Sequence, residues 1–163
     1  MFEEVKQIGL ELIAEEEPRD TLFEHEYYAF DMNSSIDGRH GQFITLKIST
    51  WSYMGGAHGN GYSAYHIFDC QKDSVINIYD FLIREDELID RVKAKLLEQI
   101  GAEPGTSLAE MGFDRISLPS NISIQQDQMV FHYNVYEIAP YSMGAPSVSF
   151  PISEMRRYFL MDL

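Results

Sequence analysis

One stretch of the chain is rich in glycine and separates two segments that read as strands: Tyr53-Met54-Gly55-Gly56-Ala57-His58-Gly59-Asn60-Gly61. Glycine has no Cβ atom and reaches positive φ, so this stretch predicts a sharply folded connection with a closely approached backbone. We interpret five of its residues as a structural loop: Gly55, Gly56, His58, Gly59 and Asn60. The alternative is a nest of amide groups that grips an anion, with His58 as a reactive neighbour. The spacing matches neither the dinucleotide fingerprint nor the phosphate loop.

The segments around this stretch alternate between the two faces of a strand. The alternation predicts strands at Thr21–Met32, Gln42–Trp51 and Tyr62–Cys70. The dipeptide Asp37-Gly38 predicts the hairpin turn between the first two. In the second strand we expect the side chains of Ile44, Leu46 and Ile48 to point inward.

The rest of the chain predicts helices and a second hairpin. Apolar residues at Leu88, Val92, Leu96 and Ile100 form one helical face, and Gly101 ends that helix. Ile122–Gln126 and Met129–Tyr136 form the hairpin, and Val148–Phe150 is a short edge strand.

Three further helices complete the prediction. They lie at Phe2–Glu16, around Leu108–Met111, and at the end of the chain with Ser153 as cap. Together these elements predict an α+β fold, a mostly antiparallel sheet with helices inserted between hairpins.

The composition favours a folded, strongly acidic domain. The chain has 163 residues and a net charge of −14. This charge disfavours nucleic acid, because phosphate binding needs a basic face, and it favours a cationic partner. No run of apolar residues is long enough to span a membrane, and the first residues do not resemble a signal peptide. If the chain is a trimmed mature domain, an upstream signal or anchor would have been removed.

The sequence lacks the patterns typical of catalytic and metal sites. None of the five histidines forms a zinc-protease motif, and no nucleophile elbow is present. Cys70, the only cysteine, excludes an intramolecular disulfide, and we interpret it as a small core residue. We therefore predict no catalytic residues, no metal and no cofactor. A carboxylate pair that cleaves polysaccharide is spatial rather than sequential, so the sequence leaves that alternative open.

A second stretch suits recognition. Three tyrosines fall between Tyr133 and Tyr141, followed by Gly144, and Pro140 stiffens the loop. Tyrosine offers a large contact area at a small entropy cost, which suits the binding of protein or sugar. We predict that a partner binds here, through Tyr136, Pro140, Tyr141 and Met143. The alternative is a strand end whose tyrosines cover the core.

Several motifs, taken together, resemble one known family. They are Tyr53-x-Gly-Gly-Ala-His58-Gly-Asn60, Phe68-Asp69, Ile78-x-Asp80-Phe81-Leu82, Tyr136-Glu137-Ile138-Ala139-Pro140-Tyr141-x-x-Gly144 and Val148-x-Phe150-Pro151. They are similar to the C-terminal domain of RsiV-type anti-sigma factors, a lysozyme receptor, also found in PdaC-type peptidoglycan deacetylases. Residues 53–163 correspond to that domain. Residues 1–52 resemble the end of the PdaC-like domain that precedes it.

The resemblance implies a non-catalytic recognition domain of the bacterial envelope, located outside the cytoplasm. The implied partner is a basic protein of the lysozyme type or peptidoglycan. The chain differs from the receptors in lacking a transmembrane helix and a sigma-binding segment. The rival hypothesis is a hydrolase or deacetylase of wall glycan that uses His58 as base.

Overall fold

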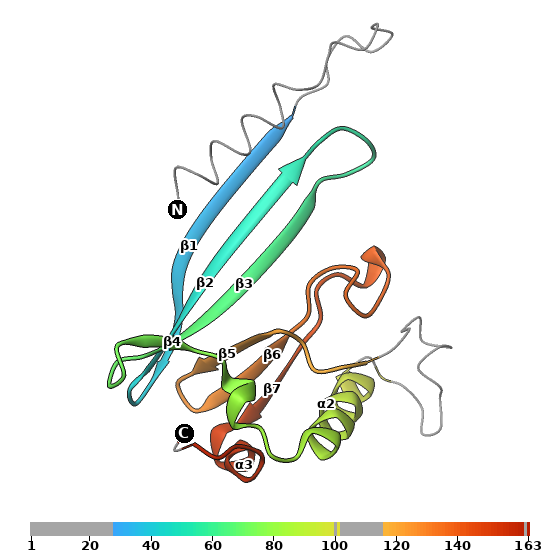
Figure 1. The fold of residues 1–163 in the computed structure, drawn as a ribbon. Helices are drawn as coiled ribbons and strands as arrows, with labels where there is room; N and C mark the ends of the chain where they lie inside the picture. Colours follow the sequence, from blue (N-terminus) through green and yellow to red (C-terminus); the bar gives the residue numbers. More distant parts are fainter. Residues whose placement is uncertain (1–27, 100, 102–115, 162) are drawn as a thin grey trace, which may run out of the picture.

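Two antiparallel sheets form the framework of the chain (Figure 1). The computed structural model describes residues 28–99, 101, 116–161 and 163. The first sheet contains, in order, β1 (Ala29–His40), β2 (Phe43–Tyr53), β3 (Asn60–Asp69) and β4 (Ser74–Ile76). The second contains β5 (Asn121–Gln125), β6 (Gln128–His132) and β7 (Ser147–Pro151).

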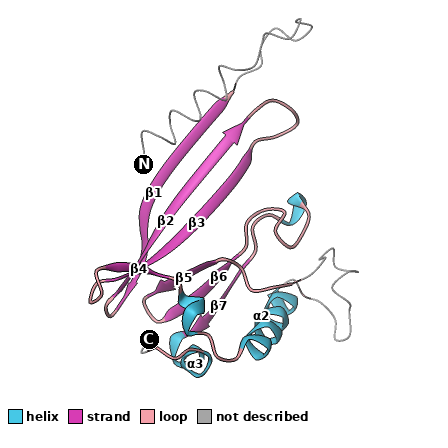
Figure 2. Cartoon of the chain, in the orientation of Figure 1, coloured by secondary structure: helices cyan, strands magenta, loops and turns pink. Residues whose placement is uncertain are grey.

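Few helices accompany these strands (Figure 2). The α-helices are α2 (Glu85–Gln99) and α3 (Ile152–Met155), and the 3-10 helices are η1 (Ile78–Phe81), η3 (Tyr141–Met143) and η4 (Arg156–Tyr158). The prediction of an α+β fold with mostly antiparallel strands is confirmed at this level.

Most of the hydrophobic core lies beside the second sheet. The predicted apolar face of α2 is buried there, with Leu88, Val92 and Leu96 at 1% exposure or less. It belongs to the same cluster as Met129 and Phe131 of β6. Burying each of these side chains stabilises the fold by about 1.5–3 kcal/mol. The three long strands contribute only Phe43 and Ile67 to the fully buried part of this cluster.

The two sheets meet where β5 crosses the first sheet. Thr45 of β2 is completely buried, and its hydroxyl accepts a hydrogen bond from Ile124 N–H at 2.9 Å and donates one to Ile124 O at 3.2 Å. Gly38 of β1 permits the close approach, because a Cβ atom there would lie 2.6 Å from Ile124 O. These contacts hold β5 against the inner face of the first sheet.

The face of the first sheet opposite to Thr45 also carries apolar residues, and several of them are exposed. Strand alternation places Phe30, Met32 and Ile36 of β1 on this outer face, and their exposed fractions are 60%, 36% and 69%. The expectation that Ile44, Leu46 and Ile48 point inward is wrong. Thr45 points inward instead, because the polar hydroxyl is needed to bond Ile124, and Leu46 is 41% exposed.

The predicted turn at Asp37-Gly38 is also wrong. β1 continues to His40, and the register with β2 shifts between Ile36 and Gly38. The dipeptide therefore marks a β-bulge, which uses the same backbone freedom as a turn. The chain reverses at Gly41, whose φ is +53°.

Other predictions differ in outcome. The second hairpin and the short edge strand at Val148–Phe150 are confirmed, but the second strand of the hairpin ends at His132 and not at Tyr136. Ser153 does not cap the last helix, because α3 begins at Ile152 with Pro151 before it. Cys70 is exposed rather than a core residue, since it follows the last residue of β3 in a surface turn. The helices expected at Phe2–Glu16 and Leu108–Met111 lie outside the described residues, as does the start of the first predicted strand.

We expect Thr45→Val to destabilise the protein by about 2–4 kcal/mol, because two buried backbone groups of Ile124 lose their partner without a change in side-chain shape. Urea unfolding of the variant and the wild type measures the difference. The matched control is Thr50→Val, whose hydroxyl bonds Tyr62 O at 3.5 Å near the surface, and which should change stability by less than about 0.5 kcal/mol. Equal effects of the two substitutions would contradict this account of the junction.

His132 gives the junction a dependence on pH. Its ring stacks on Tyr65 with centroids 4.0 Å apart and bonds Ser123 Oγ at 2.8 Å. Burial lowers the pKa of His132 from 6.5 to about 4, with Asp37 opposing and Lys47 reinforcing the shift. The unfolded chain therefore binds a proton between these two values that the folded chain does not, and stability falls as the pH falls through this range.

We expect His132→Gln to reduce the loss of folding stability at acid pH. Unfolding free energies of both proteins, measured at about pH 7 and about pH 4.5, should show the larger acid-induced decrease in the wild type. The comparison cancels the other titrating groups, which both proteins share. Equal decreases in the two proteins would mean that His132 titrates alike in the folded and unfolded states.

Candidate functional site

The two stretches that the sequence singles out lie against each other. The ring of His58 stacks on that of Tyr141, with centroids 3.9 Å apart and planes inclined by 15°. Tyr136 lies 5.5 Å from Tyr141 in a tilted arrangement, and the Tyr141 hydroxyl donates to Gly59 O at 3.4 Å. We name His58, Tyr136 and Tyr141 the aromatic cluster. It joins the β2–β3 connection to the loop after β6.

The glycine stretch has the sharply folded backbone that was predicted. Gly55 and Gly56 have φ values of +84° and +98°, which residues other than glycine rarely adopt. The Tyr53 hydroxyl donates to Gly56 O at 2.8 Å and ties the turn. Gly59 packs on the indole of Trp51, where a Cβ atom would lie 2.3 Å from Trp51 Cζ2.

The tyrosine loop is also held in an unusual conformation. Tyr136 has a φ of +65°, a region that costs a residue with a side chain about 1–3 kcal/mol. A short network holds it there, in which Asn134 N–H donates to Glu137 Oε2 at 2.8 Å and Glu137 N–H donates to Asn134 O at 3.2 Å. Such strain is typical of positions where function requires a particular orientation.

All four predicted partner-binding residues lie at the surface. Tyr136 is 57% exposed, Tyr141 39% and Met143 36%, and Pro140 is exposed directly before η3. Tyr133, by contrast, is buried and its hydroxyl donates to Ser117 O at 2.6 Å. The tyrosines of this stretch thus divide into one that belongs to the core and two that face solvent.

His58 is exposed, and its Nδ1 lies 2.9 Å from Gly59 O. Asn60, the other polar residue of the loop, begins β3 and pairs with Ser52. Among the described residues, no three His, Cys, Asp or Glu side chains are grouped to hold a metal ion. Nor is any helix in the described ranges long and apolar enough to cross a membrane.

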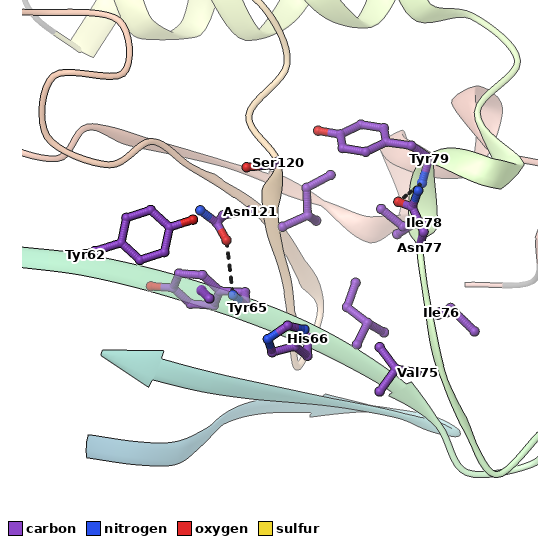
Figure 3. Close-up of a pocket in the computed structure, with 13 residues that line it drawn as sticks. Tyr62, Tyr65, His66, Val75, Ile76, Asn77, Ile78, Tyr79, Ser120 and Asn121 are labelled. Atoms are coloured by element: carbon purple, nitrogen blue, oxygen red, sulfur yellow. Dashed lines mark hydrogen bonds between the residues drawn. The ribbon is translucent and has the colours of Figure 1, made fainter. Parts of the chain in front are cut away.

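A pocket of about 480 Å³ lies beside β3 and was not predicted (Figure 3). β4 pairs only with Ile67–Asp69, so the rest of this side of β3 is free of strand partners. The pocket opens there, between β3, the segment from β4 into η1, and residues 120–122. Three tyrosines contribute to its wall: Tyr62, Tyr65 and Tyr79.

Two polar side chains of this pocket, those of Asn77 and Tyr79, are hydrogen-bonded within the protein. Asn77 accepts from Tyr79 N–H at 3.2 Å and donates to Asp80 Oδ1 at 3.1 Å. The Tyr79 hydroxyl donates to Pro119 O. Burial, with the neighbouring Tyr133, Glu137 and Glu85, raises the pKa of Tyr79 far above its usual range, so this hydroxyl remains a neutral donor.

The side-chain amide of Asn121, by contrast, is only half hydrogen-bonded. Its Oδ1 accepts a hydrogen bond from Tyr65 N–H at 3.1 Å, its exposed fraction is 4%, and its Nδ2 has no partner in the described structure. No local sequence pattern marks this residue, because its contact with β3 spans 56 positions. A buried polar group without a partner is rare in native proteins, so this amide requires an explanation.

Comparisons with known proteins agree with the fold. Residues 80–153 match the model of a family described as "Protein of unknown function (DUF3298)". A DUF3298 family member from Bacteroides fragilis has a similar structure, with a TM-score of 0.77 at 22% identity over 97% of this chain. A DUF3298 family protein from Pseudomonas aeruginosa PAO1 matches 81% of this chain with a TM-score of 0.64 at 19% identity.

At these identities the likeness establishes the fold and no function. This chain spans 64% of the length of the first structure and 62% of the second. No curated protein matches the chain significantly.

We expect Gly59→Ala to displace Trp51, because the new methyl group would overlap the indole ring. Trp51 is the only tryptophan, so its fluorescence emission reports the change directly. The control is Gly61→Ala, where a Cβ atom would make only ordinary contacts of 3.8 and 4.0 Å. Gly59→Ala should alter the emission and lower stability by about 1–3 kcal/mol, and Gly61→Ala should leave the emission unchanged. Unaltered emission from both variants would show that the loop does not need the bare backbone at Gly59.

Proposed function

We propose that this chain is a non-catalytic recognition domain of the bacterial cell envelope, and that it binds a basic protein of the lysozyme type. The observation that carries the proposal is the aromatic cluster. His58 stacks on Tyr141, and Tyr136 beside them is more than half exposed. The resemblance to the RsiV-type and PdaC-type proteins supports the location outside the cytoplasm and the nature of the partner.

The aromatic cluster has the properties of an interface centre. Tyrosine dominates binding energy at many interfaces because it buries a large area and loses few rotamers. Here the stacking on His58 and the hydrogen bond to Gly59 O fix the orientation of the Tyr141 ring before a partner arrives. Pre-organisation of this kind reduces the entropy lost on binding.

The charge of the chain suits a basic partner. At −14 the chain attracts a cationic protein over a distance of about one Debye length, which raises the association rate. The exposed side chains of Tyr136, Tyr141 and Met143 supply contacts that lose their water and slow dissociation. The two contributions therefore act on different rate constants.

A binding experiment with an immobilised basic lysozyme tests the proposal. Raising the salt from about 50 to about 500 mM should lower the association rate strongly, because the Debye length falls below about 5 Å. Tyr141→Ala should instead raise the dissociation rate by roughly 5- to 150-fold, a cost of about 1–3 kcal/mol. Phe30→Ala, which removes an exposed aromatic ring from β1, is the matched control and should leave both rates unchanged.

Either of two outcomes would contradict the proposal. If the wild type does not bind lysozyme even at low salt, the partner is wrong, and fragments of peptidoglycan are the next ligand to test. If the protein turns over peptidoglycan or chitin oligomers and His58→Ala abolishes that turnover, the chain is an enzyme that uses His58 as base.

A further inference from the structure

We propose that the pocket beside β3 is a binding site for a neutral acetamido sugar, with the Asn121 amide as the group that recognises it. This site shares no residue with the aromatic cluster, so it can be tested separately from the proposed binding of a basic protein.

The position of the pocket follows from the way β3 ends its pairing. In the part of β3 that precedes Ile67, β4 no longer pairs with it, and asparagine side chains form hydrogen bonds to the β3 backbone instead. Asn134 bonds both N–H and C=O of Ser63, at 2.8 and 3.1 Å, whereas Asn121 bonds only Tyr65 N–H. The pocket lies next to the asparagine that makes a single bond. Figure 3 shows the amide of Asn121 near Tyr62, with its oxygen directed at Tyr65.

The orientation of the Asn121 amide is fixed by this bond. Tyr65 N–H can donate only to the oxygen, so the free atom is Nδ2, a donor. A buried donor without an acceptor costs about 1–3 kcal/mol, which an oxygen atom of a ligand would recover. The ligand must therefore offer an acceptor, such as a carbonyl or hydroxyl oxygen.

The charge of the lining excludes most other ligands. Thirteen residues line the pocket, and none of them is Asp, Glu, Lys or Arg. A cationic ligand would lose its water here without gaining a countercharge, which is costly, and His66 is the one lining side chain that can carry a positive charge toward an anion. The tyrosine rings and the side chains of Ile78 and Ile122 give the wall an apolar character as well.

An acetamido sugar satisfies these conditions together. Its carbonyl oxygen is a strong neutral acceptor for Asn121 Nδ2, its methyl group suits the isoleucines, and its C–H face suits a tyrosine ring. The volume of about 480 Å³ falls within the range of small-molecule sites. The Nδ2 atom is covered by its neighbours, so a ligand reaches it only after a side chain at the rim turns. Among the residues that line the pocket, Tyr62 and Val75 are large exposed side chains at 54% and 57%, and His66, Asn77 and Ser120 are exposed as well.

Titration with N,N′-diacetylchitobiose, followed by calorimetry and by NMR of the backbone and side-chain amides, tests this site. We expect saturable binding that shifts the Asn121 side-chain amide and the Tyr65 backbone amide. Cellobiose, which has the same ring linkage without acetamido groups, should bind at least about tenfold more weakly. Equal binding of the two sugars would overturn the assignment of the acetamido group. Failure of chitobiose to bind at millimolar concentration would overturn the site, and a buried water would then satisfy Asn121.

Variants separate the site from the fold. Asn121→Asp keeps an oxygen for Tyr65 N–H but removes the amide donor, and should weaken chitobiose by about tenfold or more. Tyr62→Ala, an exposed position, provides a second variant that should fold normally and bind more weakly. Phe30→Ala is the control and should bind as the wild type does. Unchanged affinity in both Asn121→Asp and Tyr62→Ala would contradict the proposal, whatever the lysozyme experiment shows.

Discussion

The hydroxyl group of Thr45 connects the two sheets and fixes where everything else lies. β5 is an edge strand of the second sheet, so the outward N–H and C=O of Ile124 need partners from elsewhere. One hydroxyl serves both groups, as acceptor at 2.9 Å and donor at 3.2 Å. Gly38 lets the backbone of β1 approach the same point. The sheets thus join through a side chain rather than through a shared ladder of strand hydrogen bonds.

This junction divides the first sheet into two parts with different surroundings. In the part of the sheet near β4, Phe43 and Ile67 belong to the core that α2 and the second sheet share. Beyond it, the long strands project away from β5–β7, as Figure 1 shows. The outer face there is apolar and exposed, with Phe30 and Ile36 at 60% and 69%. Among the described residues, strand pairing, the bonds from Asn134 to Ser63 and the aromatic cluster hold the projecting part.

The sequence predicts local elements of this fold well and side-chain orientation in the first sheet poorly. The helix at Glu85–Gln99 and the second hairpin are found because their apolar faces really are buried. The same reasoning fails in β2. A polar residue, Thr45, faces inward to bond a strand more than seventy positions away, while Leu46 faces solvent. Asp37-Gly38 fails for a related reason, since the dipeptide serves a bulge as readily as a turn.

The aromatic cluster and the pocket beside β3 likewise could be predicted from the sequence only in part. Glycine and tyrosine mark both halves of the aromatic cluster in the sequence, although only the structure brings His58 and Tyr141 together. The pocket leaves no such mark. Its distinguishing residue is a single asparagine whose partner on β3 is set by the meeting of the two sheets. Composition and periodicity contain no information on contacts of that kind.

The two asparagines beside β3 explain why one part of this edge is structural and another part can bind. Each replaces a missing strand, and each succeeds because a side-chain amide reproduces the donor and acceptor of a peptide group. Asn134 uses both groups on Ser63, so it completes the edge, and its own backbone then anchors the strained turn at Tyr136. Asn121 uses only its oxygen, because the chain beside it turns away into the pocket wall. The Asn121 amide therefore keeps one donor, Nδ2, without a partner, and Asn121 lines the pocket beside β3.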